Sequence, residues 1–99
     1  MITIDSKKIM ELVENYKKNR KSLIEDMGEY EIEIKNNYLY VIIDGYVLDC
    51  QIIDDKFDFN YFHNHLSEVI KGLLDFHYKR IEFLKKISIS MIVNEKLEH

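Results

Sequence analysis

The alternation of apolar and polar residues between residues 29 and 53 is the clearest pattern in the chain. Residues 29–35 alternate strictly, as expected for a strand with one buried face. Asn36-Asn37 and Asp44-Gly45 then provide two pairs of residues that tolerate the positive φ of tight hairpin turns. The pattern therefore predicts a three-stranded antiparallel meander with strands at residues 29–35, 38–43 and 46–53.

The two turns also predict the register of this meander. A two-residue turn at each position pairs Val41 with Ile32 on one side and with Leu48 on the other. One sheet face then collects only apolar or aromatic residues, whereas a slip of one residue would mix the two faces. The predicted core face consists of Tyr30, Ile32, Ile34, Leu39, Val41, Ile43, Tyr46, Leu48, Cys50 and Ile52.

A first amphipathic helix is predicted before the meander, from about Ser6 to Met27. Its apolar residues recur at a spacing near 3.6, so they share one face. Asp5 or Ser6 is expected to cap its start, because a short oxygen-bearing side chain accepts a free backbone N–H there. Gly28 follows the predicted end, where a left-handed residue commonly terminates a helix.

A second amphipathic helix is predicted after the meander. It is expected to begin between Asn60 and Asn64 and to continue to about Lys86, again with an apolar face at helical spacing. Residues 87–93 fit two structures, because their alternation is typical of a fourth strand while their position favours an extension of the helix.

The order of these elements, α-β-β-β-α, predicts an α+β fold with both helices on one face of the sheet. The length of 99 residues favours one domain, which we assign to residues 1–96. Residues 97–99 read Leu-Glu-His, which is typical of the start of an expression tag.

Charge and cysteine content restrict the classes of function. The formal net charge of -4 argues against a nonspecific nucleic-acid binder, which needs clustered Lys and Arg. The single cysteine, Cys50, excludes an intramolecular disulfide and favours the reducing cytoplasm. No apolar segment approaches the roughly 20 residues that span a bilayer, so no membrane partner is expected.

No group of residues has the spacing of a catalytic or metal-binding motif. Cys50 falls on the predicted core face without a positioned histidine, which argues against a nucleophilic role. His63 and His65 form a His-x-His pair near several aspartates, but on a helix their side chains point about 200° apart. We therefore predict no enzyme activity, no metal and no cofactor.

Three polar residues fall on the apolar faces of the helices, namely Arg20, His77 and Arg80. A buried arginine needs a carboxylate or backbone oxygens as partners. One interpretation is that their stems pack while their charged ends reach solvent. The alternative hypothesis is that they meet an anionic group of a ligand or of a partner chain.

The second face of the sheet is the predicted binding surface for a partner. It presents Tyr38, Tyr40, Ile42 and Val47, together with Ile53, beside polar residues, and exposed contiguous apolar area often marks an interface. The polar residues predicted on this face are Glu29, Glu31, Glu33, Asp49 and Gln51. The alternative is that residues 1–4 or the C-terminal segment fold across it.

These observations favour a small acidic cytoplasmic interaction protein, of the adaptor, inhibitor or regulatory accessory kind found in bacteria and phages. We expect it to form a homodimer and to bind another protein. The alternative is a ligand- or nucleic-acid-binding module that uses Arg20, Arg80 and the tyrosines, because tyrosines on a sheet stack on bases.

Overall fold

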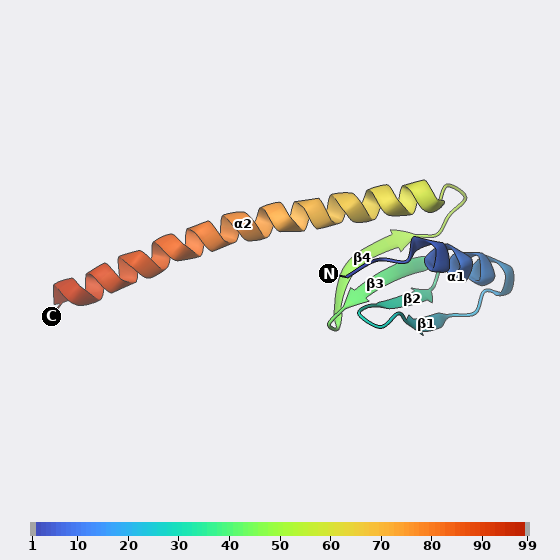
Figure 1. Cartoon of the computed structure of the whole chain (residues 1–99), viewed down its shortest axis with the longest axis horizontal. Coiled ribbons are helices and arrows are strands. Elements are labelled where there is room, and N and C mark those ends of the chain that lie inside the picture. Colours follow the sequence, from blue (N-terminus) through green and yellow to red (C-terminus); the bar gives the residue numbers. More distant parts are fainter. Residues whose placement is uncertain (1, 99) are drawn as a thin grey trace. The chain divides into compact units, whose positions relative to one another are not determined.

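The computed structural model describes the backbone of residues 2–98 and the side chains of residues 2–79 and 81. Its elements are α1 (Ser6–Asn19), β1 (Leu23–Asp26), β2 (Glu31–Lys35), β3 (Tyr38–Ile43), β4 (Tyr46–Ile52) and α2 (Phe59–Glu98), as Figure 1 shows. This is an α+β fold, as predicted. Contacts divide the chain into two compact units, Met1–Val69 and Ile70–His99, and each is described separately below.

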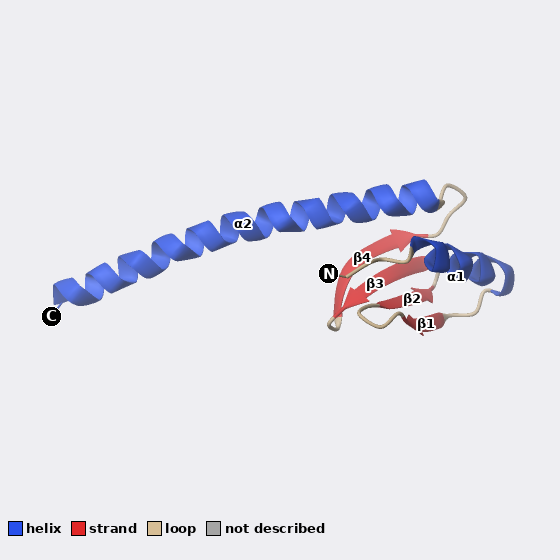
Figure 2. Cartoon of the chain, viewed as in Figure 1, coloured by secondary structure: helices blue, strands red, loops and turns tan. Residues whose placement is uncertain are grey.

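The four strands form one antiparallel sheet in the order β1-β2-β3-β4 (Figure 2). Strands β2, β3 and β4 are the predicted meander, and both predicted turns are present. Asn36, Asn37 and Asp44 have φ values of 51°, 65° and 51°, which are the positive values that two-residue hairpin turns of this kind require. The β2–β3 register is the predicted one, with Ile32 opposite Val41.

The fourth strand, β1, lies where we predicted the end of the first helix. Helix α1 begins with the predicted Asp5 cap, but it ends at Asn19 because Arg20 adopts the left-handed conformation with φ 59°. Leu23–Asp26 then pairs with β2. The apolar spacing in so short a segment fits a helix or a strand, and pairing gives the edge of β2 a partner for its free N–H and C=O groups. The prediction of a helix to Met27 is therefore wrong.

The β3–β4 register also differs from the prediction. A β-bulge inserts Leu48 between the pairs Ile42–Val47 and Val41–Asp49, so every later residue of β4 faces the opposite way. Asp49 and Gln51 therefore lie on the inner face, and Cys50 is exposed. The prediction that Tyr46, Cys50 and Ile52 belong to the core is wrong: Tyr46, beside the turn, is 79% exposed, and Ile52 is exposed as well.

The core of Met1–Val69 lies between the inner face of the sheet and the two helices, as predicted. Helix α1 packs across this face, and the first turns of α2 add two more buried side chains. The buried cluster consists of Ile9, Val13, Tyr16, Tyr30, Ile32, Ile34, Leu39, Val41, Ile53, Phe57, Phe62 and Leu66. The opposite face of the sheet, here called the outer face, receives no helix within this unit.

A polar link joins the end of α1 to the first hairpin turn. The Tyr16 hydroxyl accepts a hydrogen bond from the Asn37 backbone N–H at 2.8 Å and donates to Asn37 Oδ1 at 3.2 Å. Arg20 Nη1 donates to the same oxygen at 2.9 Å. Tyr16 and Arg20, at the end of α1, thus hold the turn at Asn37 against the helix.

The backbone of α2 is helical from Phe59 through Glu98, so residues 87–93 extend this helix and do not form a strand. The unit Ile70–His99 contains no other element. Among the residues that the structure describes, no helix combines the length and the apolar character needed to cross a membrane.

Candidate interaction surface

The outer face of the sheet is lined by three rows of side chains that run across the strands. The register places them as Ile24–Glu33–Tyr40–Cys50, Asp26–Glu31–Ile42–Val47 and Lys35–Tyr38–Ile52. All four predicted partner-binding residues, Tyr38, Tyr40, Ile42 and Val47, lie on this face. The bulge in β4 adds Cys50 and Ile52, and the unexpected strand β1 adds Ile24.

This face exposes large apolar side chains in all of its strands except β2. Tyr38, Ile52, Val47 and Ile24 are between 40% and 67% exposed, while Tyr40 and Ile42 are half-buried by their neighbours. The Tyr38 and Tyr40 rings lie 6.5 Å apart with their planes tilted by 44°. Contiguous exposed apolar area of this kind commonly marks a binding surface.

The charges on the outer face are mainly negative. This face carries three carboxylates, those of Asp26, Glu31 and Glu33, and one lysine, Lys35. The Lys35 Nζ lies 3.2 Å from Glu33 Oε1 and 5.6 Å from the centre of the Tyr40 ring. At the end of the sheet that contains Gly28 and Gly45, a notch of about 250 Å³ is bordered by four carboxylates. Its acidic residues are Asp26, Glu29, Glu31 and Asp44.

Tyr40 lies at the centre of the outer face and has a perturbed acidity. Partial desolvation by neighbouring side chains is the largest cause that raises the pKa of its hydroxyl, followed by the adjacent Cys50, while Lys35 acts in the opposite direction. The neutral phenol is therefore favoured, and Tyr40 contributes an apolar ring with one hydrogen-bonding group to this surface.

A phosphate-bearing ligand fits this face poorly, although its tyrosines have the ring surface that bases stack on. Glu31 and Glu33 stand in the same rows as Tyr40 and Ile42, and they repel phosphates. The carboxylates of this face therefore disfavour the alternative of a nucleic-acid-binding module.

The inner face holds a buried polar cluster, although the sequence pattern predicted Asp49 and Gln51 on the opposite face. Asp49 and Gln51 are 4% and 2% exposed, and Gln51 Nε2 donates to Asp49 Oδ2 at 2.7 Å and to the Phe62 carbonyl at 3.2 Å. His65 Nδ1 lies 3.0 Å from Asp49 Oδ1. These bonds attach the first turns of α2 to β4. Gln51 Oε1 has no hydrogen-bond partner among the described residues.

This cluster has a structural role that its geometry explains. The bulge turns two polar side chains inward, and buried polar groups require partners. Gln51 donates hydrogen bonds to Asp49 and to the Phe62 carbonyl, so most of these buried groups have a partner. His65 is the partly exposed member of this cluster, and Asp49 beside it is buried.

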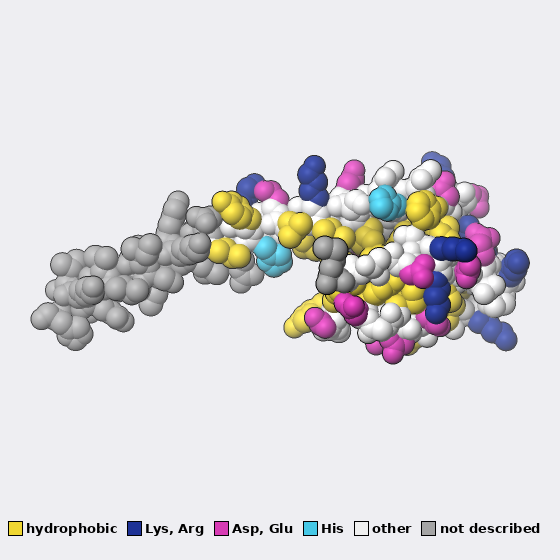
Figure 3. Space-filling model, viewed as in Figure 1, with side chains coloured by type: hydrophobic (Ala, Val, Ile, Leu, Met, Phe, Trp, Pro, Cys, Tyr) yellow, Lys and Arg dark blue, Asp and Glu magenta, His cyan; other side chains and the backbone are white. Residues whose placement is uncertain are grey.

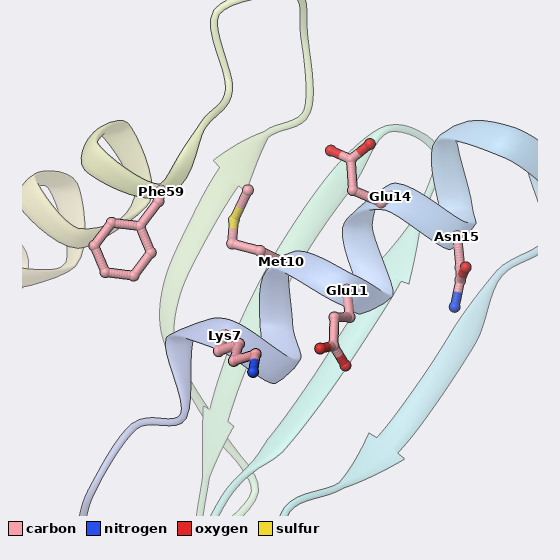
Figure 4. Close-up of a pocket in the computed structure, with 6 residues that line it drawn as sticks. All are labelled: Lys7, Met10, Glu11, Glu14, Asn15 and Phe59. Carbon is pink, nitrogen blue, oxygen red and sulfur yellow. The ribbon is translucent and has the colours of Figure 1, made fainter.

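A shallow hollow between α1 and the start of α2 is another concave feature of Met1–Val69. Figure 4 shows Met10 of α1 and the Phe59 ring of α2 beside it, with Lys7, Glu11, Glu14 and Asn15 along α1. Its walls are mostly apolar, and its polar groups do not converge on one point. Among the described side chains, no three His, Cys, Asp or Glu residues come together as a metal site.

The three residues predicted to meet an anion belong to two units, with Arg20 in Met1–Val69 and His77 and Arg80 in Ile70–His99. Arg20 is exposed and bonded to Asn37, with its guanidinium 5.8 Å from the centre of the Tyr16 ring. His77 is exposed on α2, and its ring contacts Phe76 edge-on at 5.7 Å. The side chain of Arg80 lies outside the described residues, so the hypothesis that these residues share an anion stays a prediction.

A second exposed apolar surface lies on α2 within the unit Ile70–His99. Figure 3 shows hydrophobic side chains on the surface of this helix beside charged residues and histidine. Their exposed fractions range from 37% to 68%. The members are Ile70, Leu73, Leu74, Phe76, Tyr78 and Ile81.

Comparison with known proteins adds no family to this description. No family model, no curated protein and no solved structure matches the chain. The chemistry of its own surfaces is therefore the basis for a function.

Proposed function

We propose that the chain is a small interaction protein, of the adaptor, inhibitor or regulatory accessory kind, that acts by binding and associates with itself as a homodimer. The observation that carries this proposal is the exposed apolar surface of α2. The element in Ile70–His99 is the continuation of α2, and six of its described apolar side chains are 37% to 68% exposed.

A helix with this surface needs a partner to be stable. Helices in proteins gain most of their stability by packing an apolar face against another element. Ile70, Leu74 and Ile81 are four and seven residues apart, so they form one stripe along the helix. Burying a Leu or Ile side chain contributes about 1.5–3 kcal/mol, so a partner that covers this stripe gains a substantial free energy.

The outer face of the sheet supports the same class of function, because it also exposes contiguous apolar area. Two exposed apolar surfaces among the described residues favour association over chemistry. The lone exposed Cys50 fits a reducing compartment, which supports a cytoplasmic location.

The test is the molar mass of the chain in solution across a range of concentrations, measured by light scattering after gel filtration. We expect a dimer that dissociates on dilution. Leu74→Gln with Ile81→Gln should raise the dissociation constant at least tenfold, since two buried apolar side chains are lost from the contact. The matched control is Asn64→Gln with Ser67→Gln, two exposed positions earlier in α2, which should leave it unchanged. A chain that stays monomeric at millimolar concentration would refute the proposal.

A further inference from the structure

The two units of the chain carry opposite net charges. Met1–Val69 contains eight Lys or Arg residues and fourteen Asp or Glu residues. Residues 70–96 contain six Lys or Arg residues and three Asp or Glu residues. The acidic unit carries the outer face, and the basic segment is the helix with the exposed apolar stripe. Each surface therefore has the charge that complements the other.

The outer face fits a basic amphipathic helix in its apolar chemistry as well. Ile24, Ile42, Val47 and Ile52 provide aliphatic surface, and the Tyr38 and Tyr40 rings lie among them. Asp26, Glu31 and Glu33 share the same rows, and the acidic notch continues from them at one end of the sheet. Lysines that flank the apolar stripe of a helix would find carboxylates within this surface.

The dimensions of the two surfaces also agree. Residues 70–96 form a helix about 40 Å long at 1.5 Å per residue. Four strands about 4.8 Å apart give a face roughly 19 Å across, and seven-residue strands are about 23 Å long. The helix is thus long enough to cross the whole outer face in either direction.

We propose, on the basis of the homodimer proposed above, that residues 70–96 of one copy dock on the outer face of a second copy, and that the second copy returns the same contact. Such a dimer contains two helix-on-sheet contacts related by a twofold axis. Two contacts bury twice the area of one, which favours a stable interface, since such interfaces typically bury ~1,200–2,000 Å².

Charge disfavours the two other symmetric arrangements. Pairing helix with helix brings together two segments that each have three more basic than acidic residues. Pairing sheet with sheet brings together two faces that each carry Asp26, Glu31 and Glu33. Like charges placed opposite one another in an interface lower its stability, whereas the helix-on-sheet contact joins opposite charges.

The test is complementation between a face variant and a helix variant. The face variant is Val47→Lys, which adds a positive charge at an exposed position of edge strand β4. Ile52→Lys is a second face variant at another exposed position of the same strand. The helix variant is Leu74→Gln with Ile81→Gln. Each variant alone should raise the dissociation constant at least tenfold, because both contacts of its homodimer are damaged.

A mixture of the two variants should form heterodimers, detected by native mass spectrometry from their different masses. In the heterodimer the intact helix of the face variant docks on the intact face of the helix variant, so one contact of two is restored. A contact already broken on one side loses little more when its other side is changed too, so we expect the heterodimer to exceed the statistical share of one half. Circular dichroism of each variant verifies that it is folded before mixing.

The alternatives give different results. If face variants leave the dimer unchanged, the helices pair with each other, and the helix-on-sheet inference fails while the homodimer stands. If the helix variant leaves it unchanged, the sheets pair, and both the inference and the role assigned to α2 fail. If both variants weaken the dimer but the mixture gives no excess of heterodimer, the reciprocal contact is refuted. A wild-type chain that is always monomeric overturns the proposed function itself.

Discussion

At the scale of single residues, Asp49 and Gln51 are the least expected feature of the molecule. Their side chains are buried on the inner face beside aliphatic neighbours, where an unpaired polar group is unfavourable by several kcal/mol. They are tolerated because Gln51 donates to Asp49 and to the Phe62 carbonyl, and His65 adds a contact to Asp49. These polar contacts bind β4 to α2 specifically, whereas apolar packing alone is less directional.

Alanine substitutions at Asp49 and Gln51 should be strongly non-additive. Each single change removes a partner from a buried polar group, so we expect each to lower the free energy of unfolding by about 1–3 kcal/mol. The double change should lower it by less than the sum of the two, with a coupling of ~0.5–3 kcal/mol. Urea unfolding at one fixed chain concentration measures this. Lys18→Ala, at an exposed position of α1, is the control and should stay within ~0.5 kcal/mol of wild type. Additive effects would show that the two side chains do not support each other.

At the scale of the elements, the sequence predicted most of the sheet and missed its irregularities. The class of fold, both hairpin turns and the β2–β3 register follow from local signals, because alternation and Asn-Asn or Asp-Gly pairs determine them directly. Strand β1 was missed because Leu23–Asp26 is too short for its period to be distinguished. The bulge at Leu48 was missed because the regular register satisfies hydrophobicity better in β4 taken alone.

The candidate surface was predicted in part for the same reason. Tyr38, Tyr40, Ile42 and Val47 precede the bulge or lie in β3, so their face was predicted correctly. Cys50 and Ile52 follow the bulge, and their positions depend on contacts between Gln51 and α2 that no local pattern reveals. Tertiary contacts therefore determine the part of the outer face that local sequence patterns do not predict.

The reactivity of Cys50 tests the bulged register directly. In the bulged register the thiol is exposed on the outer face, whereas the regular register would bury it. In native protein diluted below its dissociation constant, we expect Cys50 to react with a thiol reagent within about tenfold of the rate in the urea-unfolded chain. The matched control is Val41→Cys in a Cys50→Ser background, which places the thiol on the buried inner face and should be strongly protected. A protected Cys50 in the dilute chain would indicate the regular register.

At the scale of the whole molecule, the separation of charge predicts the sign of the salt dependence of dimerisation. Raising the ionic strength from about 0.01 M to 1 M shortens the Debye length from roughly 30 Å to 3 Å. Contacts between a basic helix and an acidic face should weaken, so we expect the dissociation constant, measured by sedimentation, to rise by about tenfold. Pairing of two basic helices or of two acidic faces predicts the opposite sign, because salt screens repulsion.

Two double variants, each of which removes two negative charges, test whether the salt dependence of dimerisation arises on the outer face. Glu31→Gln with Glu33→Gln removes two carboxylates from the outer face, and Asp54→Asn with Asp55→Asn removes two from the exposed loop after β4. Only the first pair should flatten the dependence on salt, because screened charges act over about a Debye length and those of the outer face meet the helix directly. Equal flattening by both pairs would mean that the net charge of the unit matters and the location of its carboxylates does not. That result would remove the electrostatic reason for placing the helix of one copy on the sheet of the other.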